Sequence, residues 1–581
     1  MSRSLNWSVR KTRVLNRLQA RLSTRARPAT GFVSQPEPRT IGSFARGRQL
    51  AAGNFLFAGS LVESAERSIW DLPMPDPSFE EELHGFTWLD DLASVGDSPA
   101  RRRAQAWTSD WITQFGRGSG PGWTPDLTGR RLIRWINHAL FLLNGQEREV
   151  SDAYFRSLAQ QTIFLSRRWK AASSGLPRFE ALTGLIYAGL ALTGMDENVK
   201  PATRALAREC DSQIDSEGGI PTRNPEELLE VFTLLTWAAS ALGEAGRMPA
   251  RAHMAAIERI APTLRALRHA DGGLARFHGG GRGMEGRLDH ALAASGVRAG
   301  TNSRLSMGFA RLSGGRTTVI VDASAPPQDR ASYNGHASTF AFELTSGRRP
   351  VVVNCGSGIS FGEVWRRAGR ATPSHSTLGV EGYSSARLGK AGIVAGHKRE
   401  FLADSPRLVK VQQAAGFEGI SLQGGHDGYL RTHGLTHMRN LDLSSDGRML
   451  AGEDTLATVH DRDKARFDSA MDRSRLQGIE FAVRFHLHPD VDAEVDMGGA
   501  AVSLALKSGE IWVFRHDGSA KMTLEPSVYL EKNRLKPRAT KQVVLNGRVL
   551  EYASRVSWTL AKAQDTPLGL RDLAQDDGPP L

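Results

Sequence analysis

The chain has 581 residues, with 74 Lys and Arg against 62 Asp and Glu and a formal net charge of +12. This length exceeds one ordinary hydrophobic core, so we expect two large domains or three smaller ones. Only Cys210 and Cys355 are present, which excludes a disulfide framework and leaves room for one bridge at most.

The first 50 residues carry most of the net positive charge, with 11 Lys and Arg against the single acid Glu37, a net +10 of the total +12. Such an arm favours a solvated helix or a membrane-surface helix over a contact with substrate, and we expect no nucleic-acid partner. No uncharged apolar run of about 18 residues occurs, so no spanning helix is expected. The N-terminus lacks an apolar segment followed by a small-residue cleavage site, so no secretory signal is expected.

After a proline-rich connector at residues 71–77, apolar residues recur at helical spacing up to about Gly243. We expect a repeating order of helix, short turn and helix, in which several helices bury more than one face. The later segments expected to be helical are 151–170, 179–192, 201–214, 225–242 and 251–269. Helical hairpins at this spacing suit a solenoid or an (α/α) toroid, and the pattern leaves both open.

From Arg304 the apolar period shortens towards two, in β-branched runs such as TTVIVDA and RPVVVNCG. Many short strands at hairpin spacing predict an antiparallel β-sandwich up to about Ala563. A glycine-rich junction at 270–300 separates the helical and strand-rich parts. The expected fold class is therefore multidomain α + β, with a basic arm at 1–70, a helical domain at 71–290, a sandwich at 301–563 and an acidic tail at 564–581.

Three motifs follow one another early in the predicted sandwich: HASTFAFEL at 336–344, VVVNCGSG at 351–358 and WRRAGRATPSHSTLGVEG at 365–382. In order and spacing they resemble strand motifs of the heparinase II/III group of polysaccharide lyases. RFEALTGLIYAGL and SEGGIPTRNPEELLE, in the helical half, are similar to a helix and a turn of the same group. The resemblance covers most of residues 80–560 and implies an (α/α) toroid, a β-sandwich and a cleft between them.

The lyases of this group cleave uronic-acid polysaccharides by β-elimination, so the resemblance implies an acidic polysaccharide as partner and no required cofactor. The reaction needs donors that neutralise the uronate carboxylate, a base for the C5 proton and an acid for the leaving oxygen. Where the group has an Asn-His pair, this chain reads Leu176-Pro177, and where the group presents a tyrosine, it reads Glu226-Glu227. Both departures fall on residues that would perform the chemistry.

The turn before the last of these positions also has a simple structural interpretation. Asn224 as N-cap, Pro225 at the first helical position and Glu227 at the third form a good helix start. We favour this interpretation of Glu227 over a catalytic role.

The resemblance and the local pattern select four candidates for the chemistry. His336 belongs to the first motif, and Asn334 stands where some members have a histidine and can still donate a hydrogen bond to a carboxylate. Tyr429 lies among several titratable groups in GGHDGYLRTHGLTHMRNLDL and is the candidate for a substitute base, with an ordinary polar sheet face as the alternative. Arg223 is a candidate carboxylate clamp, with a salt bridge as the alternative.

Two further residues are assigned to substrate binding. Arg178 and Glu180 begin the helix that the resemblance places beside the cleft. For Arg178, an ordinary salt bridge is again the alternative.

Some members of the group hold a structural zinc in the sandwich, and the matching positions here are His336, Asn354 and His375. Asn is a poor zinc ligand, although Cys355 supplies a thiolate if the strand end shifts by one residue. Without metal, the two imidazoles are expected to form a buried hydrogen-bonded pair or to act on substrate. One structural zinc is therefore compatible with the sequence but not required by it.

Three functions are compatible with these observations. The first is a polysaccharide lyase, and the second is a non-catalytic descendant that binds an envelope glycan or a protein partner. The third, glycoside hydrolysis, requires two facing carboxylates, for which Glu180, Glu226 and Glu227 are the evident candidates. The resemblance points to the periplasm or cell envelope, whereas the missing signal segment points to the cytoplasm.

Overall fold

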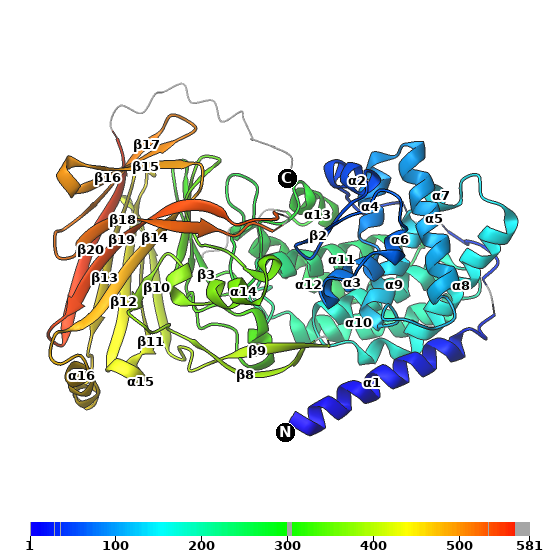
Figure 1. Ribbon diagram of the computed structural model, residues 1–581, viewed down its shortest axis with the longest axis horizontal. Coiled ribbons are helices and arrows are strands. Elements are labelled where there is room, and N and C mark those ends of the chain that lie inside the picture. Colours follow the sequence, from blue (N-terminus) through cyan, green and yellow to red (C-terminus); the bar gives the residue numbers. More distant parts are fainter. Residues whose placement is uncertain are drawn as a thin grey trace.

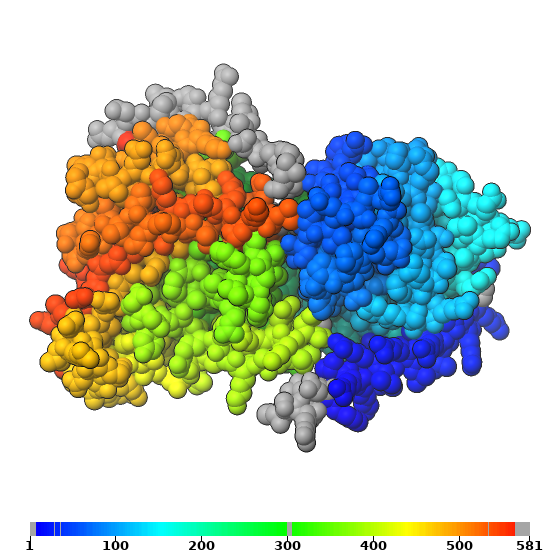
Figure 2. Space-filling view, in the orientation of Figure 1, coloured from blue at the N-terminus to red at the C-terminus, as the bar shows by residue number. Residues whose placement is uncertain are grey.

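The computed structural model describes residues 2–27, 29–34, 37–298, 305–394, 396–532 and 534–563. A helical domain and a domain of stacked sheets lie side by side (Figures 1 and 2). The expected acidic tail at 564–581 lies outside the described residues.

The helical domain is an array of helical hairpins that begins at the N-terminus (Figure 1). A short hairpin of β1 (Asn54–Phe57) and β2 (Ser60–Glu63) is inserted between its early helices. Its helices are α1 (Ser2–Ser23), α2 (Phe44–Ala51), α3 (Pro77–Gly85), α4 (Trp88–Val95), α5 (Ser98–Phe115), α6 (Pro125–Asn137), α7 (Ala139–Leu143), α8 (Arg148–Arg168), α9 (Leu176–Ala191), α10 (Val199–Gln213), α11 (Pro225–Glu244), α12 (Arg251–Ala266) and α13 (Arg287–Ser295).

Two glycines allow α6 and α9 to cross closely at the centre of this domain. A Cβ added at Gly184 would lie 2.4 Å from the Cα of Gly129, so a side chain there would force the helices apart. Around this crossing, tryptophans pack edge to face, as in the Trp111 and Trp135 pair with ring centroids 5.5 Å apart. Both faces of α9 are buried, as its apolar sequence predicts.

The predicted basic arm does not form a separate unit. Helix α1 packs along α8, where Ala20 is buried, and Leu50, Phe55 and Ile69 belong to the core of the helical domain. The positive charge of the arm is therefore carried by a docked helix and by segments that complete the helical domain. The predicted boundary at residue 70 is corrected by this packing.

Two antiparallel sheets form the sandwich. The first has the order β10-β11-β12-β13-β20-β17-β16-β15, and the second has the order β18-β19-β14-β6-β5-β4-β3, with β7 paired to β14. The strands are β3 (Phe309–Gly314), β4 (Thr317–Asp322), β5 (Phe342–Ser346), β6 (Arg349–Val353), β7 (Leu378–Val380), β10 (Val409–Ala415), β11 (Gly419–Tyr429), β12 (Leu435–Ser444), β13 (Met449–Ala457), β14 (Ile479–Leu487), β15 (Val491–Asp496), β16 (Ala501–Leu506), β17 (Ile511–His516), β18 (Lys521–Tyr529), β19 (Arg538–Val549) and β20 (Ala553–Lys562).

The sandwich core is aromatic between the two sheets. Phe342 and Trp558 stack with an interplanar angle of 7°, and Phe485 lies against both rings. Three short helices lie outside the sheets: α14 (Glu363–Gly369), α15 (Leu430–His433) and α16 (Asp461–Arg473). The predicted fold class is confirmed.

One hairpin leaves the sandwich and reaches the helical domain. Strands β8 (Arg387–Val394) and β9 (His397–Ala403) pair with each other in a sheet of their own, and Figure 1 shows them extending below the domain interface. At the hairpin tip, His397 Nε2 lies 2.7 Å from Glu81 Oε1 of α3. Strand β8 also contacts α1, so the hairpin joins both domains at one edge of their interface.

Candidate functional site

A groove follows the interface between the two domains. It consists of three neighbouring cavities, here called the α1 chamber (about 560 Å³), the central chamber (about 620 Å³) and the distal chamber (about 890 Å³). The α1 and central chambers share walls formed by Glu81, Ser173, Pro177, Arg330 and His397. The central and distal chambers share Gln213, Ile220, Pro221 and Ala331. Each cavity is large enough for a small ligand, and three in a row suit a polymer.

The central chamber contains an acid pair contributed by the two domains. Glu227 comes from the first turn of α11, and Tyr333 comes from the 3-10 turn Asp329–Asn334 of the sandwich domain. The Tyr333 hydroxyl donates to Glu227 Oε2 at 3.4 Å. Burial raises the pKa of Glu227 to about 7, and burial followed by the nearby Glu227 raises the pKa of Tyr333.

Positive side chains lie on the sandwich side of the same chamber. Arg399 is on β9, and burial, followed by the nearby Arg366, lowers its pKa. Arg330 donates to the carbonyl of Ile393 at 2.9 Å and also lines the chamber. Two guanidinium groups beside a carboxyl group that is half neutral near pH 7 suit an anionic ligand.

The start of α11 explains why Glu227 points into the chamber. The Asn224 side chain accepts from the backbone N–H groups of Glu226 and Glu227 at 3.0 and 3.2 Å, which confirms the predicted N-cap. Glu226 accepts from the Gly281 N–H at 2.8 Å and pairs with Lys532. The carboxyl group of Glu227 reaches Tyr333 in the chamber, a contact that the favoured interpretation of Glu227 as part of a helix start does not include.

The chain matches the family model described as Heparinase II/III-like, C-terminal, over residues 297–559. It is 31% identical over 546 residues to the FtsZ-localized protein C of Caulobacter vibrioides, covering 92% of this chain and 91% of that protein. The chain belongs to the heparinase II/III-like family. This membership confirms the resemblance of its strand motifs.

Solved structures with this fold include members of the same family. A heparinase III structure covers 94% of this chain and 88% of its own length, with a TM-score of 0.68 and 13% identity. The heparan sulfate lyase HepC of Pedobacter heparinus covers 94% of this chain and 88% of its own, with a TM-score of 0.55 and 15% identity. At these identities the likeness shows the fold, a helical toroid followed by a β-sandwich.

The two sequence departures of this heparinase II/III-like chain meet in one place. Leu176 and Pro177, at the start of α9, line the central chamber together with Glu227 and Tyr333. Neither Leu176 nor Pro177 has a side chain that donates a hydrogen bond to a carboxylate. The position implied for the Asn-His pair is therefore apolar, although it faces the groove.

His336 and His375 form a buried pair inside the sandwich domain. His336 Nδ1 lies 3.0 Å from His375 Nε2, and His375 Nδ1 lies 2.9 Å from the carbonyl oxygen of Ala371. Burial lowers the pKa of His375 to about 3 and holds the pKa of His336 well below its usual value. Neither residue is among the described residues that line the three chambers, so their placement supports a structural role.

The third predicted zinc position does not complete a metal site. The Asn354 Oδ1 accepts from the Ser376 N–H at 2.9 Å, and the Cys355 thiol lies 3.5 Å from His486 Nδ1. In the ranges that the structure covers, no three His, Cys, Asp or Glu side chains are arranged to hold a metal ion. Two imidazoles without an anionic third ligand do not fit the zinc site that the resemblance implies.

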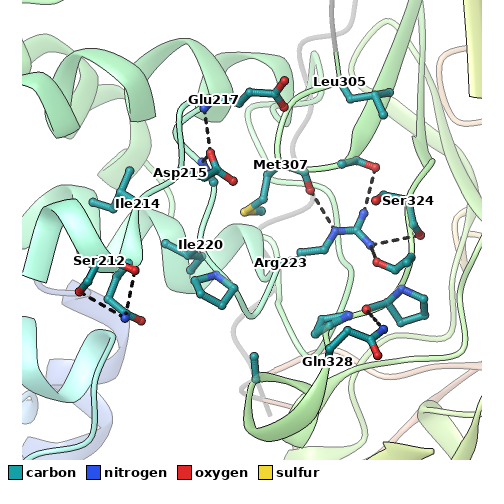
Figure 3. A pocket seen from close by; sticks show the side chains of 18 of the residues that line it. Ser212, Ile214, Asp215, Glu217, Ile220, Arg223, Leu305, Met307, Ser324 and Gln328 are labelled. Carbon is teal, nitrogen blue, oxygen red and sulfur yellow. Dashed lines mark hydrogen bonds between the residues drawn. The ribbon is translucent and has the colours of Figure 1, made fainter. Parts of the chain in front are cut away.

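Arg223 is a structural link between the domains. Its guanidinium pairs with Asp322 at 2.6 Å and donates to the carbonyl oxygen of Ala325. It also donates to the carbonyl oxygen of Met307 (Figure 3). Although burial opposes ionisation, Arg223 holds the pKa of Asp322 far below its usual range. The side chain borders the distal chamber, but its donors are used, which favours the predicted salt-bridge alternative over a substrate clamp.

Arg178 and Glu180 are occupied by partners within the helical domain. Arg178 pairs with Glu209 at 3.3 Å and donates to the Ala172 carbonyl at 2.7 Å. Glu180 accepts two hydrogen bonds from Arg130, at 2.8 and 2.9 Å. Neither belongs to the described chamber walls, so the structure places both predicted substrate contacts behind the groove.

The two remaining candidates, Tyr429 and Asn334, are not among the described residues that line the three chambers. Tyr429 is fully buried in the sandwich core and donates to the Leu378 carbonyl at 3.1 Å, which corrects its prediction as a substitute base. Asn334 follows Tyr333, but its side chain lies where a Cβ on Gly279 would meet it at 2.9 Å. The predicted residue Asn334 is thus the chain neighbour of Tyr333, which does line the central chamber.

Proposed function

We propose that this heparinase II/III-like protein holds an acidic, uronate-containing glycan in the interdomain groove without cleaving it by β-elimination. The observation that carries the proposal is the apolar Leu176-Pro177 wall of the central chamber. In β-elimination the uronate carboxylate must be neutralised before its C5 proton becomes acidic enough to remove. An apolar wall at the implied position supports binding without that activation.

The remaining groups of the chamber suit recognition of such a glycan. Arg330 and Arg399 offer charged donors to carboxylate or sulfate groups. The neutral form of Glu227 offers a hydroxyl donor to sugar oxygens, and the Tyr333 oxygen, whose proton is donated to Glu227, offers an acceptor to sugar hydroxyl groups. Because the pKa of Glu227 is about 7, this recognition is strongest in mildly acidic solution.

Polysaccharide lysis is the second candidate function, and the Glu227–Tyr333 contact favours it. A carboxyl group with a pKa of about 7 is well matched to proton transfer near neutral pH. In this alternative, Glu227 takes the C5 proton, Tyr333 donates a proton to the leaving oxygen, and Arg399 neutralises the uronate.

One experiment separates the two functions. Purified protein is mixed with heparan sulfate, hyaluronan, alginate and polygalacturonate; binding is measured by calorimetry, and ultraviolet absorbance follows the conjugated product of β-elimination. Binding without growth of absorbance is expected. Absorbance growth that disappears in Glu227→Gln would establish the lyase instead, and the absence of binding to every polymer would overturn the glycan proposal.

We also propose that the chain acts at a membrane surface and shares a location with FtsZ in the bacterial cell. The relative from Caulobacter vibrioides is named for its localisation with FtsZ. In the described residues, no helix is both long and apolar enough to span a bilayer, but α1 exposes Trp7, Val14, Leu18 and Leu22 to between 38% and 65%. These residues recur at helical spacing in a helix that carries several Lys and Arg residues, such as Lys11, as in helices that lie on anionic membranes.

The location is tested by imaging a fluorescent fusion beside labelled FtsZ, together with cell fractionation. Coincident signals and recovery with the membrane fraction are expected. A signal spread evenly through the cell would contradict this part of the proposal, and release with the periplasm would instead favour the compartment implied by the family resemblance.

A further inference from the structure

Helix α1 has a docked face that fixes its position on the helical domain. Asn16 accepts from Arg168 Nε at 2.8 Å, and the Ala20 carbonyl accepts from Gln160 at 3.3 Å, both on α8. Ala20 and Ser23 are buried in this contact. The helix is therefore held by specific polar contacts as well as by packing, and its orientation relative to the groove is defined.

A second edge of α1 forms one wall of the α1 chamber. Arg13 and Arg17 lie on this edge, one helical turn apart, so their side chains are neighbours. Opposite them are the start of α3, residues 120–127 and the tip of the β8–β9 hairpin, where a Cβ on Gly396 would lie 3.7 Å from the Arg13 guanidinium. Figure 2 shows α1, in dark blue, along the lower side of the helical domain.

The acids of the α1 chamber do not neutralise these arginines. Glu81 pairs with His397, and Asp126 interacts with Arg130, whose pKa it helps to raise. Burial and the neighbouring Glu81 raise the pKa of Glu80. Within the described part of the chain, Arg13 and Arg17 have no ion-pair partner.

The same chamber is continuous with the groove that holds the Glu227–Tyr333 pair. Arg330 and His397 belong to the walls of both chambers. A polyanion that binds beside Arg330 therefore meets the α1 arginines if it continues in that direction. A ligand confined to the central chamber does not reach them.

We propose that α1 is part of the glycan-binding site, with Arg13 and Arg17 binding the anionic groups of a polymer that extends from the central chamber into the α1 chamber. This proposal rests on the proposed glycan-binding function and adds a subsite that only long chains reach. The N-terminal helix thereby makes the groove bind long polymers more tightly than short ones.

The test compares binding of oligogalacturonates and heparan sulfate oligosaccharides, from disaccharides to dodecasaccharides, to wild type and to two double variants. The inner-edge variant, Arg13→Ala/Arg17→Ala, removes the two positive charges that line the α1 chamber. Arg10→Ala/Arg21→Ala removes the same charge from exposed positions of α1 outside the described chamber walls. Thermal melting and circular dichroism confirm that both variants keep the wild-type fold.

The inner-edge variant is expected to bind the longest oligomers about tenfold more weakly and the shortest ones unchanged, because two charge-assisted contacts are lost. The control variant is expected to stay within about twofold of wild type at moderate salt. Equal losses in the two variants would show general charge attraction and overturn the subsite, as would no loss in the inner-edge variant. If wild type binds no oligomer of any length, the glycan-binding function itself fails.

Discussion

Tyr333 and Glu227 meet across the domain interface, with the tyrosine oxygen 3.4 Å from Glu227 Oε2. Each residue comes from a different domain, so the pair exists only when the two domains are packed together. The pair also places beside the proposed ligand a carboxyl group whose pKa burial raises to about 7.

Glycan affinity is expected to fall as the pH rises through about 7. Below that pH Glu227 is neutral, and above it the carboxylate repels an anionic ligand. Glu227→Gln is expected to flatten the profile, measured by calorimetry between pH 5 and about pH 9. Glu230→Gln, on the same helix, is the control and should keep the wild-type profile. A pH dependence that persists in Glu227→Gln would assign the titration to another group.

Removing the Arg223 guanidinium is expected to destabilise the protein. Arg223→Ala leaves Asp322 buried without its cation, and breaking such a pair costs about 3–5 kcal/mol. Denaturant unfolding followed by fluorescence measures the loss. Arg247→Ala, which removes a partly exposed pair with Asp196, should cost about 1 kcal/mol or less. Equal effects of the two variants would contradict the role of Arg223 as a link between domains.

Metal removal is expected to leave stability unchanged. The Asn354 oxygen is already used by the Ser376 N–H, and His336 bonds to His375 directly. Dialysis against a chelator should not shift the thermal midpoint, and metal analysis should find less than about one zinc per ten chains. One zinc per chain, lost in His375→Ala, would show that the strand end rearranges around a metal.

The buried imidazoles predict a loss of stability in acid. Burial lowers the pKa of His375 and His84 to about 3, while an unfolded histidine takes up a proton near pH 6.5. Their contribution is therefore complete above about pH 6.5 and falls as the pH drops towards 3, by about 1.4 kcal/mol per pH unit for each histidine. Thermal midpoints should decline over this range, less steeply in His84→Gln and as in wild type for the exposed His460→Gln.

The outer face of α1 is expected to bind vesicles that contain anionic lipid. Trp7→Glu/Leu18→Glu should reduce co-sedimentation roughly tenfold, because it places acids on a stripe that is apolar and flanked by arginines. Leu140→Glu, at an exposed apolar position on α7, is the control and should bind as wild type does. Equal binding by all three proteins would remove α1 as the contact.

The sequence predicted the architecture well, because elements with strong periodicity carry their own signal. The segment expected at 225–242 is helical over Pro225–Glu244, and the expected end of the sandwich at residue 563 lies one residue beyond β20. The spacing of apolar residues along a segment shows which of its faces is buried, so the segment itself indicates whether it is a helix or a strand.

The site was harder to predict, because its members come together only through tertiary packing. Glu227 and Tyr333 are 106 positions apart, and the cap at Asn224 gave Glu227 a sufficient local explanation. Tyr429 was selected for its titratable neighbours, but β12 buries His437 and Arg439 in the sandwich core. There the Asp454 carboxylate pairs with both, so a run that resembled a solvent-facing site is an internal network.

Helix α1 touches the body of the protein on one face, the groove on a second and its surroundings on a third. Because α1 is a single rigid helix, a partner that shifts it on one face also changes the contacts on the other two faces. If a ligand in the groove changes the affinity of the outer face for a membrane by some factor, thermodynamic reciprocity requires that membrane binding change the affinity for that ligand by the same factor. The binding of long polymers and the binding of a membrane surface would thus depend on the same 22-residue helix.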